Sequence, residues 1–240
     1  MFVIVQTGDP LPLAQKFGSF ADWFISGLHI DQHDVLVVDV HKNQSLPQAP
    51  LSALSGVVIT GSASMVTEQS QWMKQTQNWL EQAITAGTAV LGVCFGHQLL
   101  ADLLGGQVAF NQAGRHMGLA RCELTAAGVE DDLLGPLQPH INTLVSHQQV
   151  VTQLPESAVR LGTTAADLNH AFRWGDRVWG LQFHPEWRPE IMSAYINERA
   201  TDLRHEGFDP DAMQRDLLPC HEASSILARF AELAKTFQRD

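Results

Sequence analysis

The chain has 240 residues, of which 45% are hydrophobic, so it can form one large core and is neither a disordered nor a fibrous protein. Its 15 Lys and Arg against 26 Asp and Glu give a net charge of −11, which argues against nucleic-acid binding and against binding to an anionic membrane. Three cysteines are too few for a disulfide scaffold. The N-terminal segment has no basic leader and the chain has no apolar run of membrane-spanning length, so we expect a cytoplasmic protein.

The first hundred residues alternate short apolar segments with segments of helical periodicity. This alternation predicts strands at 2–6, 35–40, 56–60 and 88–93, and helices at 13–28, 71–86 and 97–104. Nearly continuous apolar strands separated by helices are typical of a parallel sheet covered on both faces. We therefore expect an α/β fold with a mostly parallel central sheet.

The middle of the chain changes character and the end is helical. Short strands are predicted at 119–124, 150–154, 158–162, 171–174 and 178–183, and their turns suggest antiparallel ribbons at the sheet margin. From about residue 189 the pattern is helical, with breaks near 209–210 and 219. Without repeats or a low-complexity linker, we expect one domain over 1–190 and a helical extension over 191–240. That extension is expected to pack on its own domain; a lid, a homodimer surface and a docking helix are the alternatives.

The segment Gly92-Val93-Cys94-Phe95-Gly96 lies between the fourth predicted strand and a helix. A nucleophile on such a sharp turn needs small residues two positions away on each side, which is the logic of the G-x-S-x-G elbow with sulfur in place of oxygen. The start of the following helix favours a thiolate at Cys94. Neither Cys122 nor Cys220 has such a setting, so both are expected to be structural.

A cysteine nucleophile needs a base and usually a group that orients this base. His184-Pro185-Glu186 follows the predicted strand 178–183, and catalytic groups collect at the carboxyl ends of strands in such sheets. We therefore predict His184 as the base and Glu186 as its partner, and expect His97 to be a packing residue. The segment 29–34, with two His and two Asp, resembles a metal cluster but has the composition of an ordinary helix-to-strand turn.

Gly61 follows the third predicted strand and reaches the same edge of the sheet as Cys94. Its backbone N–H, together with that of Phe95, is a candidate donor pair for an oxyanion. The segment lacks the Lys of a phosphate-binding loop, and the chain has no G-x-G-x-x-G motif. We expect neither a cofactor nor a metal.

Together the segments 92–98 and 179–186 and the loop at 61–62 resemble the class I (triad) glutamine amidotransferases, especially the glutaminase domain of GMP synthase and its stand-alone relatives. The resemblance covers about residues 1–190 and implies a flavodoxin-like α/β fold. It implies a catalytic triad of Cys94, His184 and Glu186, and oxyanion donors at Gly61 and Phe95.

The same resemblance implies substrate contacts. Gln98 would contact a bound glutamine. The segment 145–150 resembles the family pattern S-H-x-D-x-V, which assigns Ser146, His147 and Gln148 to substrate binding. Gln149 stands where the family has Asp, so the hydrogen bonding of this loop departs from the family pattern.

Such a domain hydrolyses the side-chain amide of glutamine through a γ-glutamyl thioester and releases ammonia. The chain has no S-G-G-x-D-S loop of a synthase domain, so an ammonia acceptor is expected on a separate partner chain. A stand-alone γ-glutamyl peptidase is the first alternative. A regulatory or binding protein with a vestigial site is the second.

Overall fold

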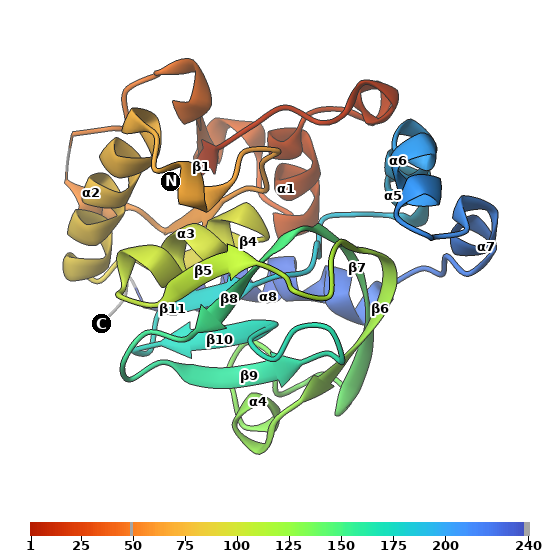
Figure 1. Ribbon diagram of the computed structural model, residues 1–240. Coiled ribbons are helices and arrows are strands. Elements are labelled where there is room, and N and C mark those ends of the chain that lie inside the picture. The colour runs from red at the N-terminus through yellow and green to blue at the C-terminus, as the bar shows by residue number, and fades with distance from the viewer. Residues whose placement is uncertain (49, 238–240) are drawn as a thin grey trace.

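The computed structural model describes residues 1–48 and 50–237, and its centre is a mixed β-sheet with helices on both faces (Figure 1). Within the described residues, nine strands form this sheet in the order β2-β1-β3-β4-β11-β10-β9-β6-β7. Their bounds are β1 (Phe2–Gln6), β2 (Val35–Asp39), β3 (Gly56–Ile59), β4 (Val90–Val93), β6 (His116–Leu124), β7 (His140–His147), β9 (Val159–Thr163), β10 (Ala171–Trp174) and β11 (Val178–Leu181). A separate antiparallel pair joins β5 (Gln107–Phe110) to β8 (Gln149–Gln153).

The sheet has a parallel part and an antiparallel part. Strands β2, β1, β3, β4 and β11 run parallel to one another, whereas β10 pairs antiparallel with β11 and the pairs β10–β9, β9–β6 and β6–β7 are also antiparallel. This arrangement confirms the predicted fold class. The prediction was wrong for β11, which does not lie at the margin: it is the fifth strand of the parallel part, with Leu181 opposite Val93.

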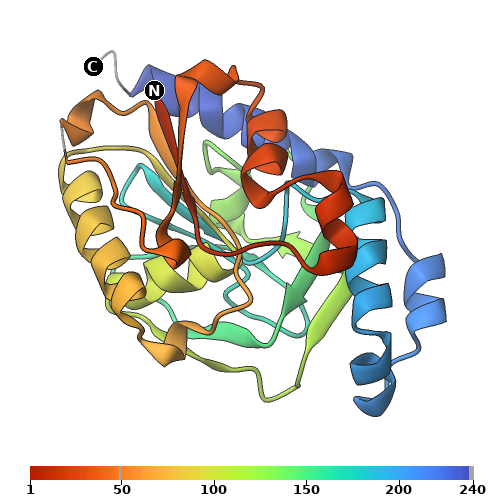
Figure 2. The same ribbon diagram turned by 90° about the horizontal axis from the view of Figure 1, so that it is seen from above.

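The alternation of side chains along β1 explains why both faces of the sheet are covered. Phe2 and Ile4 belong to one core cluster, with side chains of α1 (Phe20–Leu28) and α8 (His221–Thr236). Val3 and Val5 belong to the other, with side chains of α2 (Gln71–Thr85) and α3 (Phe95–Leu103). Successive residues of a strand point to opposite faces, so an all-apolar strand requires a helix layer on each side. Figure 2 shows the two helix layers with the sheet between them.

The predicted helix 13–28 is two helices. A 3₁₀ helix, Pro12–Phe17, ends at Gly18, whose φ of 106° favours glycine, and α1 starts after Ser19. The Ser19 hydroxyl accepts the Asp22 N–H while the Asp22 carboxylate accepts the Ser19 N–H, which is a capping box. Helix 71–86 is confirmed as α2, whereas α3 begins two residues earlier than predicted. Before the C-terminal helices, the chain also has short 3₁₀ helices at Gln32–Asp34, Val40–Lys42, Leu51–Ala53 and Val66–Glu68, and a short α-helix, α4, at Ala126–Val129.

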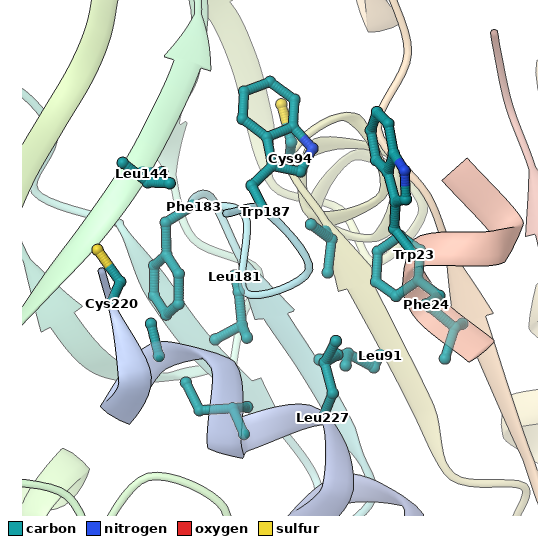
Figure 3. Packing of buried hydrophobic residues seen from close by; sticks show 14 of the residues in the cluster. Trp23, Phe24, Leu91, Cys94, Leu144, Leu181, Phe183, Trp187, Cys220 and Leu227 are labelled. Carbon is teal, nitrogen blue, oxygen red and sulfur yellow. The ribbon is translucent and has the colours of Figure 1, made fainter. Parts of the chain in front are cut away.

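The end of the chain forms α5 (Pro189–Glu198), α6 (Ala200–His205), α7 (Pro210–Arg215) and α8. The predicted breaks are confirmed, because α7 begins at Pro210 and α8 begins just after Pro219. Leu227 points from α8 toward Leu91 of β4, and both belong to the main core cluster (Figure 3). Helix α8 is therefore part of the same core as the sheet. No described helix is both long and apolar enough to cross a membrane.

Candidate active site

Cys94 lies on a tight turn between β4 and α3. Its backbone has φ 52° and ψ −103°, a conformation that L-residues rarely adopt. A Cβ at Gly92 would lie 2.4 Å from the carbonyl oxygen of Gly96, and one at Gly96 would lie 2.5 Å from that of Ile59. Both close approaches are to backbone atoms, so only glycine fits at these positions. The predicted elbow is present, and the fold holds Cys94 in a strained conformation.

The neighbouring strands fix the position of the thiol. The Cys94 N–H donates to the carbonyl oxygen of Leu181 at 2.8 Å, which links the turn to the end of β11. The Sγ atom lies 3.8 Å from the carbonyl oxygen of Ser146. Cys94 is 5% exposed and lines a pocket whose other walls come from the predicted loop and base segments.

His184 lies three residues beyond the end of β11, and its Nδ1 lies 2.7 Å from Oε1 of Glu186. The backbone N–H of His184 donates to the carbonyl oxygen of Leu144 at 2.9 Å, so β7 also anchors this turn. Burial disfavours the imidazolium, but the charge of Glu186 and the Cys94 side chain outweigh this effect and raise the pKa of His184 to about 10. The second carboxylate oxygen of Glu186 is buried and has no hydrogen-bond partner among the described residues.

The His184 ring packs against aromatic side chains on one face. Trp187 stacks on it with a centroid distance of 3.8 Å and an interplanar angle of 10°, and Tyr195 of α5 packs on Trp187 at 4.4 Å. The Tyr195 hydroxyl oxygen accepts the N–H of Leu11 at 3.4 Å. These contacts leave the imidazole little freedom to rotate. In Figure 3, Trp187 and Cys94 overlap at the top of the view, and both belong to the main hydrophobic cluster.

Gly61 lies close to both Cys94 and His184. A Cβ at Gly61 would be 3.0 Å from Cε1 of His184 and 3.8 Å from Cβ of Cys94. The hydroxyls of Thr7 and Thr60 donate to the Gly61 carbonyl oxygen at 2.8 and 3.0 Å and fix the peptide that follows it. Phe95 is the first residue of α3, where a backbone N–H has no partner within the helix. Of the two predicted oxyanion donors, Phe95 thus lines the pocket, and Gly61 lies beside Cys94 and His184.

The predicted substrate-binding residues Gln98, Ser146, His147 and Gln148 all line the pocket. The Gln98 amide nitrogen donates to the carbonyl oxygen of Gln149 at 2.8 Å and to Oε1 of Gln182 at 2.9 Å. Gln98 therefore fixes the loop that follows β7 as well as facing the pocket.

The side chain of Gln149 is fully buried, although the family pattern has a charged Asp there. Its amide nitrogen donates to the hydroxyl of Thr67 at 2.6 Å, and its amide oxygen has no partner among the described residues. This free oxygen is an acceptor that carries no charge.

The remaining candidates lie elsewhere. Burial raises the pKa of Cys122 to about 12 and that of Cys220 to about 11, which makes both thiols poor nucleophiles. His97 is buried with its ring 5.0 Å from that of Phe172, as expected of a packing residue. In the segment 29–34, the side chains of Asp31, His33 and Asp34 lie close together but are all exposed to solvent, so the protein does not enclose a metal site there.

The model of the class I glutamine amidotransferase family matches residues 16–202. This chain belongs to the class I glutamine amidotransferase family. It is 30% identical over 203 residues to a GMP synthase [glutamine-hydrolyzing] of Porphyromonas gingivalis, covering 84% of this chain and 36% of that one. It is 26% identical over 204 residues to gamma-glutamyl peptidase 5 of Arabidopsis thaliana, covering 84% of this chain and 81% of that one. The crystal structure of a glutamine amidotransferase from Thermotoga maritima has the same fold, with a TM-score of 0.76, 20% identity and coverage of 100% and 99%.

This amidotransferase family member thus spans about a third of that GMP synthase and most of that peptidase. Its pocket also contains side chains that the sequence did not predict: Trp187, Tyr195, Arg199, Arg115 and Asp9. Trp187 directly follows the H-P-E motif and could have been considered for that reason. The other four carry no local signal, because only the packing of α5 and two loops places them at the pocket.

Arg115 connects the pocket mouth to the C-terminal helices. Its guanidinium lies 2.7 and 2.9 Å from the carboxylate oxygens of Glu206, just after α6. Tyr195 and Arg199 also belong to this region. Residues beyond 190 therefore form part of the pocket wall.

Proposed function

We propose that the protein hydrolyses a γ-glutamyl amide through a thioester on Cys94. The observation that carries this proposal is the arrangement of Cys94, His184 and Glu186 at the carboxyl ends of two adjacent parallel strands, with Gly61 beside them. A thiol, an imidazole and an orienting carboxylate are the parts of a nucleophilic triad.

In the first step the Cys94 thiolate attacks the amide carbon, and its former proton is carried by His184. The raised pKa of His184 supports this ion pair. The backbone N–H groups of Gly61 and Phe95 stabilise the oxyanion. The C–N bond then breaks, His184 gives the proton to the leaving amine, and the γ-glutamyl group remains on sulfur.

In the second step a water molecule attacks the thioester carbon while His184 accepts its proton. The C–S bond breaks and releases the γ-carboxyl group, which loses its own proton to the solvent. The Cys94 thiolate and the protonated His184 are thereby restored. Glu186 holds the imidazole orientation in both steps through the bond at 2.7 Å.

Glutamine is the substrate that we propose, and ammonia the product that a separate synthase chain would use. The family membership and the similarity to GMP synthase support this substrate. Gln98 and the segment 146–148 would hold the glutamyl part, because they line the pocket beside Cys94.

One observation favours a second candidate, a stand-alone γ-glutamyl peptidase. Gln149 gives the substrate loop a neutral acceptor in place of a carboxylate, and the chain covers most of the length of gamma-glutamyl peptidase 5. A peptide amide would then replace the primary amide at the same thiol.

A substrate panel separates the two candidates. Ammonia release from glutamine would be measured beside amine release from γ-glutamyl peptides, for the wild type and for Cys94→Ala and Cys122→Ala. We expect Cys94→Ala to abolish turnover of every cleaved substrate and Cys122→Ala, also at a buried thiol, to retain it. Wild-type turnover by Cys94→Ala would refute the proposed mechanism, and faster cleavage of peptides than of glutamine would favour the peptidase.

A further inference from the structure

A buried group of imidazole and carboxylate side chains lies behind the pocket wall, in the antiparallel part of the sheet. His147 ends β7, His170 immediately precedes β10, and Asp167 lies in the turn before it. These three side chains are 6%, 0% and 4% exposed, respectively. One ligand atom from each lies within 4.8 Å of the other two.

The hydrogen bonds of His147 leave one nitrogen ready to bind a ligand. Its Nδ1 lies 3.0 Å from the carbonyl oxygen of Gln149, which assigns the proton to Nδ1. Its Nε2 is buried and has no partner among the described residues. A ring that donates one N–H to a backbone carbonyl and keeps the other nitrogen free has the arrangement of a metal-bound histidine.

Asp167 and His170 face each other at a distance that a metal ion can bridge. Nδ1 of His170 and Oδ2 of Asp167 are hydrogen-bonded at 3.1 Å. A metal ion bound to both atoms would replace the proton of this bond, because two ligands of a tetrahedral zinc ion lie about 3.3 Å apart. The other carboxylate oxygen of Asp167 accepts the N–H of Asn169 at 3.0 Å, which fixes the plane of the carboxylate. The ring of Phe183 stacks on that of His170 at 5.5 Å and holds it in place.

We propose that His147, Asp167 and His170 bind one divalent transition-metal ion of the zinc type. Two imidazole nitrogens and a carboxylate oxygen are a ligand set that suits such an ion, whereas Mg²⁺ and Ca²⁺ prefer all-oxygen ligands. His170 binds as the neutral imidazole, with its remaining proton on Nε2. His116 lies next to this group, with its ring centroid 5.2 Å from that of His147. Its Nδ1 is buried and lacks a partner among the described residues.

The site has a structural consequence for the pocket. His147 lines the pocket and the bound ion would tie it to the turn that holds Asp167. Metal binding would therefore stiffen the segment 146–149 and raise the thermal stability of the folded chain. This effect does not depend on which amide the protein cleaves.

The test uses Co²⁺ as a spectroscopic probe on the full-length protein after treatment with a chelator. We expect one Co²⁺ per chain with the visible absorption of a four-coordinate nitrogen and oxygen site, and Zn²⁺ should displace it and raise Tm. The variants His170→Gln and Asp167→Asn should bind Co²⁺ about tenfold or more weakly and lose the Zn²⁺-dependent rise in Tm.

His33→Gln is the matched control, because it removes a histidine from the exposed group with Asp31 and Asp34. This control should bind Co²⁺ as the wild type does. The wild-type titration decides the proposal even if a variant fails to fold. No visible absorption from the wild type, or the same affinity in His170→Gln, would overturn the proposal, as would loss of binding in His33→Gln.

Discussion

The strained backbone of Cys94 leads to a prediction about stability that is independent of catalysis. With φ 52° and ψ −103°, any side chain at this position costs of order 1–3 kcal/mol, which glycine avoids. Replacing Ala by Gly elsewhere in a buried helix loses about 0.5–1 kcal/mol of backbone entropy and about 0.8 kcal/mol of methyl burial. At residue 94 the relief of strain offsets these losses.

The comparison requires two pairs of proteins. Cys94→Ala and Cys94→Gly form the first pair, and the wild type and Ala101→Gly form the second, because Ala101 is fully buried within α3. Urea unfolding gives the free energy of unfolding of each. We expect the change from Ala to Gly to be about 1–3 kcal/mol more favourable at position 94 than at position 101. Equal penalties at the two positions would refute the inference that the elbow stores strain.

Three further predictions concern the site and the core. In the wild type, the raised pKa of His184 contributes stability that is fully present below its unfolded value of about 6.5 and is lost as the pH rises toward about 10. The difference in unfolding free energy between the wild type and Glu186→Gln, measured in urea, should therefore shrink over that pH range, and a difference independent of pH would contradict this. Gly61→Ala should lower kcat/KM roughly tenfold or more with little change in the free energy of unfolding, because its Cβ would lie 3.0 Å from Cε1 of His184. An unchanged kcat/KM would show that the loop moves to accommodate the methyl group. Phe230→Ala, at a fully buried position of α8, should cost about 3–5 kcal/mol of unfolding free energy, whereas Leu218→Ala, at a half-exposed position in the segment before α8, should cost under about 1 kcal/mol. Similar losses would mean that α8 is not a core helix.

Much of the fold could be predicted from the sequence because its signals are local. The apolar runs of the parallel strands, the glycines around Cys94 and the prolines that begin α5 and α7 each act within a few residues. The same holds for His184 and Glu186, since they follow the end of a strand. The break at Gly18 was missed because the apolar periodicity continues across it.

The position of β11 was misjudged for a different reason. Its sequence is compatible with either a marginal or a central strand, and pairing with β4 decides between them. Periodicity records which face of a strand is buried, but it carries no record of the neighbouring strand.

The sequence by itself determined the α/β class, the glycine-flanked turn at Cys94 and the pairing of His184 with Glu186, because these features depend on residues close together in the chain. Only the tertiary structure decided that Trp187 stacks on His184 with Tyr195 packed behind it, and that His147, Asp167 and His170 meet in one buried group. Those side chains come from separate strands, turns and helices. Their meeting depends on strand pairing and side-chain packing, which bring together residues that are distant in the chain.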